Sequence, residues 1–209
     1  MQGQMQSRGA LVVRKIKRRG PGLGWHLRNR LRWGFLKGWI AKHAIAPFAN
    51  WWGVMTAIAE LEITLIKRNG ERVYYGVVGY RVITNNGVGF LVDAWQNLTE
   101  LETMIYHGCG TGTTAEAAAD SALVTESTTA LNPDSTRATG TQSEPGSNQL
   151  RSTGTATFDG SAAITEHGLF SQAATGGGTL FDRTVFSAVN VVSGESIQFQ
   201  YTVTFTAGG

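Results

Sequence analysis

Short runs in which polar and apolar residues alternate, each closed by a turn, constrain the fold of this chain more than any other feature. The last run, residues 196–206, alternates strictly. A period of two places its apolar side chains on one face of a β-strand. Residues 60–67 and 72–84 lie on either side of an Asn69–Gly70 dipeptide, which is a strong signal for a β-hairpin.

The chain beyond residue 100 repeats this pattern of a short run followed by a turn. Its 27 Gly and 4 Pro suit many short strands better than long helices. We therefore predict a mainly β fold, with an antiparallel β-sandwich or jelly-roll-like body. Further strands are expected at residues 102–109, 123–129, 136–144, 150–158, 163–171 and 179–189.

Two segments of the body differ from the strand pattern. Residues 88–96 fit either a short buried helix, which we favour, or another strand. In residues 111–120, Thr113 or Thr114 precedes an Ala-rich stretch, which is the pattern of a capped helical turn.

Charge is sorted along the chain. Residues 1–59 contain eleven Lys or Arg and no Asp or Glu, whereas residues 60–209 contain seven basic and fifteen acidic residues. Five of the six Trp also lie in the basic part. Surfaces of folded domains usually mix their charges, so a segment this biased indicates contact with a negative partner. We predict a basic, Trp-rich N-terminal arm (residues 1–54) attached to a β-sandwich body (residues 55–209).

The arm has helical composition over residues 25–43, interrupted by Gly34 and Gly38. Its apolar residues do not gather on one face of a helical wheel, as they would in a helix that lies on a lipid surface. The uncharged stretch 43–59 is shorter than the roughly 20 apolar residues of a spanning helix and contains Pro47. We therefore expect a segment contacted from several sides, and no membrane partner.

The cations of the arm could contact phosphates or acidic protein surfaces, and its Trp residues could stack on bases or anchor a protein interface. Five Trp in one arm favour protein docking, with non-specific nucleic-acid contact as the alternative. The residues that we expect to bind a partner are Arg14, Lys15, Lys17, Arg18, Arg19, Trp25, Arg28, Arg30, Arg32, Trp33, Lys37, Trp39, Trp51 and Trp52.

Motifs that carry chemistry are missing from the sequence. It has no nucleophile elbow, Walker loop or His-Glu-x-x-His motif. His107 lies two residues from Cys109, the single cysteine, but we interpret this pair as a buried thiol beside a core histidine. Four histidines and one cysteine are few for a metal site, and His167 has one adjacent carboxylate. We assign no catalytic, cofactor-binding or metal-ligating residue and predict no enzyme activity.

Five segments of the body form a familiar order, namely residues 110–116, 120–126, 163–170, 178–186 and 194–198. In this order the chain resembles virion structural proteins of tailed bacteriophages. The similarity covers about residues 94–209, and the arm lies outside it.

This resemblance implies a capsid decoration or cement protein, located in the virion after assembly in the host cytoplasm. A tail, adaptor or fibre component is the alternative within the same class. The resemblance also implies a homo-oligomer, for which a trimer is one form, and a major capsid protein or another virion protein as partner. We expect the arm to tie neighbouring capsid subunits together and to take its shape from the surface that it binds.

Overall fold

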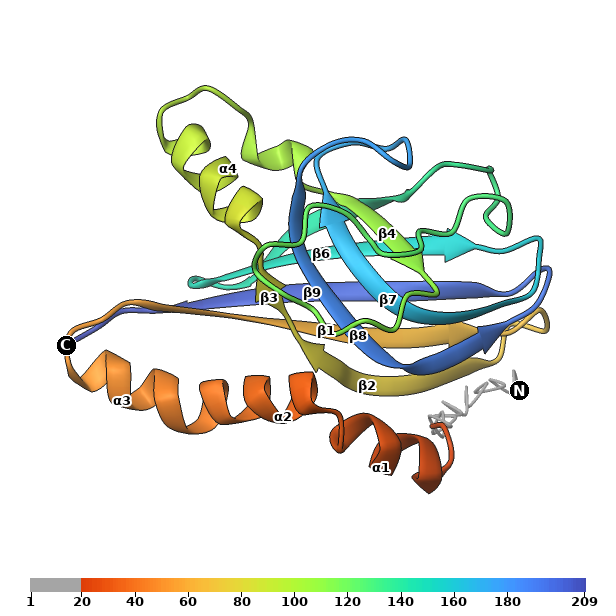
Figure 1. The fold of residues 1–209 in the computed structure, drawn as a ribbon, viewed down its shortest axis with the longest axis horizontal. Coiled ribbons are helices and arrows are strands. Elements are labelled where there is room, and N and C mark those ends of the chain that lie inside the picture. The colour runs from red at the N-terminus through yellow and green to blue at the C-terminus, as the bar shows by residue number, and fades with distance from the viewer. Residues whose placement is uncertain (1–19) are drawn as a thin grey trace, which may run out of the picture.

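The computed structural model describes residues 20–209, and nine strands in this range form one antiparallel sheet (Figure 1). The order across the sheet is β2-β1-β9-β6-β5-β4-β7-β8-β3. The strands are β1 (Thr56–Ile66), β2 (Arg72–Tyr80), β3 (Val82–Ile83), β4 (Tyr106–Gly110), β5 (Ala138–Gly146), β6 (Gln149–Thr157), β7 (Ala162–Phe170), β8 (Leu180–Val191) and β9 (Ser196–Thr206).

The mainly β, antiparallel class predicted from the sequence is confirmed. β9 has the bounds that strict alternation predicted, and Ile197 and Phe199 lie fully buried on its inner face. The hairpin of β1 and β2 turns through Gly70, whose φ of +80° favours glycine. The division into two packed sheets is not established, because one continuous sheet joins all nine strands.

The two ends of the sheet lie close together. β2 and β3 are the terminal strands of the order, yet Arg81 alone separates them along the chain. The Thr184 hydroxyl on β8 donates to the carbonyl of Tyr80 at the end of β2, over 3.5 Å. The sheet therefore curls around its core, and β2 and β8 form the two sides of a seam.

The segment after β3 is a helix, as we favoured. α4 (Asn85–Trp95) begins three residues before the predicted segment, where Thr84 caps it. The Thr84 hydroxyl accepts a hydrogen bond from the amide of Gly87 (2.9 Å) and donates to the carbonyl of Leu180 (2.6 Å). A short 3₁₀ helix, η2 (Leu101–Thr103), follows before β4.

The helical turn predicted at residues 111–120 and the strand predicted at 123–129 are wrong. These residues form a loop over the sheet, with single β-bridges in place of a ladder. The buried carboxylate of Glu166 accepts hydrogen bonds from the amides of Gly112, Val124 and Thr125, over 2.8 to 3.1 Å. Because a side chain pairs these amides, the loop is held without regular secondary structure.

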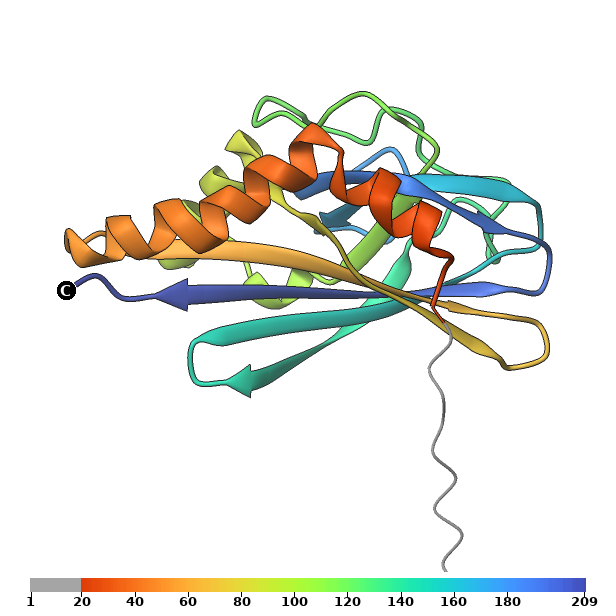
Figure 2. The same cartoon turned by 90° about the horizontal axis from the view of Figure 1, so that it is seen from below.

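Helices form most of the described part of the predicted arm. They are α1 (Leu23–Arg30), α2 (Trp33–Ile40), the π-helix η1 (Ala41–Ile45) and α3 (Ala46–Trp51). Figure 2 shows them as one row along the side of the sheet where β2 and β8 lie. Of residues 20–209, no helix is long and apolar enough to cross a membrane.

Gly34 and Gly38 do not interrupt the helix but let it approach the body. They are four residues apart and share one face of α2. A Cβ on Gly38 would collide with the side chain of Tyr80, and a Cβ on Gly34 would collide with that of Glu116. The two glycines are therefore the points at which α2 packs against the sheet and the loop.

α1 covers the seam between β2 and β8. The Trp25 indole donates to the carbonyl of Ala188 over 2.8 Å and belongs to the main hydrophobic core. The Asn29 amide donates to the carbonyl of Val78 on β2 (2.7 Å) and accepts from the amide of Ser187 on β8 (2.8 Å). One side chain thus pairs backbone groups of two strands that have separated.

The expectation that the arm takes its shape from a partner is therefore wrong for residues 23–51. They are helical and packed on the chain's own sheet, because Trp25, Asn29 and the two glycines fit that surface. The boundary between residues 54 and 55 stays a prediction about independent folding.

Candidate functional site

The N-terminal helices and the residues just after them expose many large apolar side chains. Of 21 such exposed residues in the described chain, 13 lie between Leu23 and Met55. We call these 13 the helical face. So many exposed large apolar residues within one short segment indicate an interaction site. The face consists of Leu23, Leu27, Leu31, Trp33, Leu36, Trp39, Ile40, Ile45, Phe48, Trp51, Trp52, Val54 and Met55.

An aromatic cluster lies at the α3 end of this face. The rings of Trp51 and Trp52 meet edge to face at 5.5 Å, and Phe48 lies 6.3 and 6.2 Å from them. Trp51 is 72% exposed and Trp52 is 67% exposed. Aromatic side chains of this kind supply a large contact area and are typical anchors of protein interfaces.

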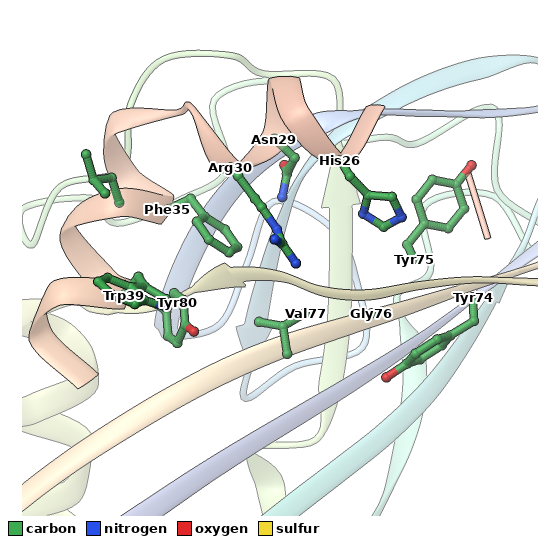
Figure 3. Close-up of a pocket in the computed structure, with 11 residues that line it drawn as sticks. His26, Asn29, Arg30, Phe35, Trp39, Tyr74, Tyr75, Gly76, Val77 and Tyr80 are labelled. Carbon is green, nitrogen blue, oxygen red and sulfur yellow. The ribbon is translucent and has the colours of Figure 1, made fainter. Parts of the chain in front are cut away.

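A groove of about 750 Å³ runs between the helices and β2 (Figure 3). Figure 3 shows the Arg30 side chain extending from α1 into this space, beside Phe35. Trp39 and Tyr80 lie at one end, and His26 and Tyr75 lie at the other. The groove thus combines aromatic walls with a guanidinium group, which suits an apolar or aromatic group with negative charge nearby.

The residues of the N-terminal helices carry charge of one sign, although Glu60 and Glu116 of the body contact these helices. Residues 20–59 contain five basic residues and no acidic residue. Lys42 pairs with Glu60 of β1 over 2.6 Å, so this cation holds the helices on the sheet. Arg28, Arg30 and Lys37 are exposed, and Arg32 is half-buried. The surface as a whole is apolar and basic.

The structure separates the predicted partner-binding residues into three groups. Trp33, Trp39, Trp51 and Trp52 lie on the helical face with the basic residues Arg28, Arg30, Arg32 and Lys37. Trp25, 9% exposed, is part of the core and supports the fold. Arg14, Lys15, Lys17, Arg18 and Arg19 lie outside the described residues.

A second polar site, which the sequence did not reveal, lies inside the sheet. Arg81 Nη1 lies 2.5 Å from His167 Nδ1, and His167 Nε2 lies 3.0 Å from His107 Nδ1. His107 Nε2 in turn lies 2.9 Å from the Ser152 hydroxyl. Arg81 also pairs with the carboxylate of Asp182. Arg81 lies between β2 and β3, and the other four residues come from four separate strands. An arginine inside the strand pattern of residues 72–84 was one signal available in the sequence.

The chemistry of Arg81 fixes the direction of this hydrogen-bond chain. A guanidinium can only donate, so His167 Nδ1 accepts and its Nε2–H donates to His107. His107 Nε2–H then donates to the hydroxyl of Ser152. Both histidines are therefore neutral Nε2–H tautomers, linked in one direction.

The electrostatics of the buried chain favour neutral imidazoles. Burial lowers the pKa of His107 to about 3, and the charge of Arg81 adds to this effect. Burial also lowers the pKa of His167 well below its usual value, with Arg81 and His107 contributing. Burial raises the pKa of Asp182, although the charge of Arg81 acts in the opposite direction.

The buried groups are poorly placed for catalysis. Ser152, His107 and His167 are each at most 1% exposed, so a substrate could not reach the serine without opening the sheet. Burial raises the pKa of the Cys109 thiol to about 12, with Glu126 and Glu166 adding to the shift, so no thiolate forms at neutral pH. Within residues 20–209, no group of three or more His, Cys, Asp or Glu side chains could hold a metal ion.

Arg183 lies buried within the largely apolar strand β8 and has two carboxylate partners. Its guanidinium contacts Glu166 (2.8 Å) and Asp120 (2.9 Å). It also donates to the carbonyl of Thr114 over 3.0 Å. Glu166 is the same carboxylate that pairs the loop amides, so the two form one structural cluster.

Comparison with known proteins gave no match to a protein-family model, to a curated protein or to a solved structure.

Proposed function

We propose that this protein is a non-enzymatic structural component of a phage virion, most directly a capsid decoration or cement protein. The exposed helical face carries the proposal, because so large an apolar and basic surface suits permanent contact with another protein. The resemblance of residues 94–209 to virion proteins of tailed phages supplies the kind of assembly. The proposed partner is the major capsid protein or another virion protein with an acidic, apolar surface.

The geometry of the helices changes how such a protein would hold its neighbours. The helices of residues 23–51 are already ordered on the sheet, so they offer a preformed surface. Docking of a preformed surface avoids the ordering entropy that a free tether would lose. The aromatic cluster of Phe48, Trp51 and Trp52 is the proposed anchor at one end of this surface.

The matching experiment replaces that anchor without disturbing the fold. Phe48→Ser, Trp51→Ser and Trp52→Ser are combined in one variant, with Leu150→Ser and Val192→Ser as a matched control at exposed apolar positions elsewhere. Deletion of residues 1–50 is unsuitable because it removes Trp25 from the core.

Phage particles assembled with each protein are purified, and the amount of bound protein is measured. We expect the wild type and the control variant in the particles, located by immunogold electron microscopy, and loss of the triple variant. Equal incorporation of all three proteins would contradict docking through the helical face. Absence of the wild-type protein from purified particles would contradict the virion assignment itself.

A second candidate, a nucleic-acid-binding protein, draws support from exposed cations at the end of α1. Arg28 and Arg30 are exposed on this helix, and the sequence places six further basic residues before it. This function predicts DNA binding whose affinity falls steeply as salt rises, because each phosphate contact releases counterions. A gel-shift titration over a salt series tests this function, and a DNA affinity that does not change with salt concentration would exclude it.

A further inference from the structure

α4 and the segment after it form a second exposed apolar surface. Trp95 is 78% exposed and Leu98 is 71% exposed. Phe90 points inward and is buried, so the helix is attached through its opposite face. We call the exposed group the α4 face, and it consists of Val88, Val92, Trp95, Leu98 and Leu101.

The charge around the α4 face is opposite to that of the helical face. Residues 82–105, which include the α4 face, contain three acidic residues and no Lys or Arg. Asp93, Glu100 and Glu102 are exposed beside the apolar residues of the α4 face. One molecule therefore carries an apolar, acidic surface and an apolar, basic surface. Complementary potentials of this kind favour association and select the register of an interface.

The two surfaces cannot meet within one molecule. Figure 1 shows α4 above the sheet and the row α1 to α3 below it, and Figure 2 agrees, with the N-terminal helices on the near side. Two complementary surfaces on opposite sides of one chain fit a head-to-tail contact between copies. An isologous contact would instead bring two surfaces of the same charge together.

We propose that the α4 face of one copy docks on the groove of a second copy, with Trp95 seated between Phe35, Trp39 and Tyr80. The guanidinium of Arg30 then lies against the Trp95 ring or the nearby carboxylates, and both contacts favour a cation there. This inference rests on the docking role given to the helical face under the proposed function, and it names a second copy of this chain as an occupant.

A head-to-tail contact has a consequence that a two-fold contact lacks. Each copy uses one groove and one α4 face, so every added copy leaves one of each free. Such a series closes into a ring or continues as a filament. Two defective variants with different damaged surfaces can still form one good contact between them.

That complementation is the test. The groove variant carries Arg30→Glu and Trp39→Ala, and the α4 variant carries Val92→Ser and Trp95→Ser. All four side chains are exposed, and circular dichroism checks the fold of each variant. Sedimentation velocity over a concentration series is then measured for the wild type, each variant, an equimolar mixture and the Leu150→Ser/Val192→Ser control.

We expect the wild type and the control to associate. Each variant should associate with an affinity at least about tenfold lower, which is the effect of losing a buried anchor. The mixture should form a heterodimer and stop there. A monomeric wild type, association unchanged in both variants, or a mixture that stays monomeric would each overturn the inference.

A covalent readout covers the case in which a variant folds poorly. Trp39→Cys and Trp95→Cys proteins, each bearing one exposed cysteine in addition to buried Cys109, are mixed and oxidised. A crosslinked heterodimer in excess over either homodimer is expected, and equal yields of all three would overturn the proposal. A wild type that stays monomeric but enters particles would overturn the head-to-tail contact and keep the proposed function. A wild type that associates but never enters particles would keep the contact and overturn the proposed function.

Discussion

The interior of the sheet and the outer side of the N-terminal helices contrast in polarity, in the reverse of the usual sense. The interior buries Arg81, Asp182 and Arg183 completely, whereas the helices expose Trp51 and Trp52. The buried charges form ion pairs within the chain, so the monomer accounts for their burial. The described part of the monomer does not account for the exposure of the aromatic side chains. The comparison therefore favours the helical face as the candidate interaction site, although the interior contains the reactive residue types.

The largest expected effect comes from breaking a buried ion pair. Arg183→Leu leaves Glu166 buried without its cation, and removal of one partner of such a pair costs about 3–5 kcal/mol of stability. Urea unfolding measures the loss. Arg28→Leu, which removes an exposed arginine from α1, should change stability by about 0.5 kcal/mol or less. Similar losses of stability in both variants would show that the buried ion pair contributes no more to stability than an exposed arginine does.

The neutral histidines predict a dependence of stability on pH. The unfolded chain binds protons at these residues near pH 6.5, whereas folded His107 does so near pH 3. Stability is therefore complete above pH 6.5 and falls as the pH drops toward 3, by about 1.4 kcal/mol per pH unit for each histidine. His107→Gln should lower this slope by about half in unfolding curves measured at pH 6 and pH 5. An unchanged slope would mean that His107 is protonated equally in both states.

A smaller effect is expected at the seam. Asn29→Ala removes the side chain that pairs the carbonyl of Val78 and the amide of Ser187. A buried backbone group left unpaired costs about 1–3 kcal/mol of stability. Hydrogen exchange at Ser187 should accelerate together with the fall in urea midpoint. If exchange at this amide stays slow, α1 does not close the seam.

The smallest change in stability is expected on the helical face. Trp51→Ser with Trp52→Ser should alter the unfolding free energy by about 0.5 kcal/mol or less, because both side chains are exposed. The same variant should show much less binding of a fluorescent probe for apolar surface. A large loss of stability would instead assign these residues to the fold of the monomer.

The sequence predicted the elements whose signals are local. Strict alternation fixed β9, and the Asn69–Gly70 turn fixed the first hairpin, since both depend on neighbours along the chain. The loop at residues 111–129 was missed because its amides pair with Glu166, about 40 residues further along. Gly34 was interpreted as an interruption, although it is a contact point for Glu116.

The two candidate sites differ in the same way. The composition of residues 1–59 identified a basic, aromatic segment without any knowledge of the fold, and its role in binding a partner stays a prediction. The chain from Arg81 through His167 and His107 to Ser152 could not be predicted, because its members come from separate segments that meet only in the curled sheet. The same limit applied to Trp25, whose burial depends on the position of β8.

The hydrogen bond from Trp25 to Ala188 joins residues 163 positions apart, which has a consequence for biogenesis. The N-terminal helices, which expose large apolar side chains, leave the ribosome long before β8 has been translated. Contacts so distant in sequence form slowly, and Trp25 cannot donate to Ala188 before β8 has been translated. Nascent chains therefore pass through a period in which the tryptophans on both sides of these helices are open to chaperones.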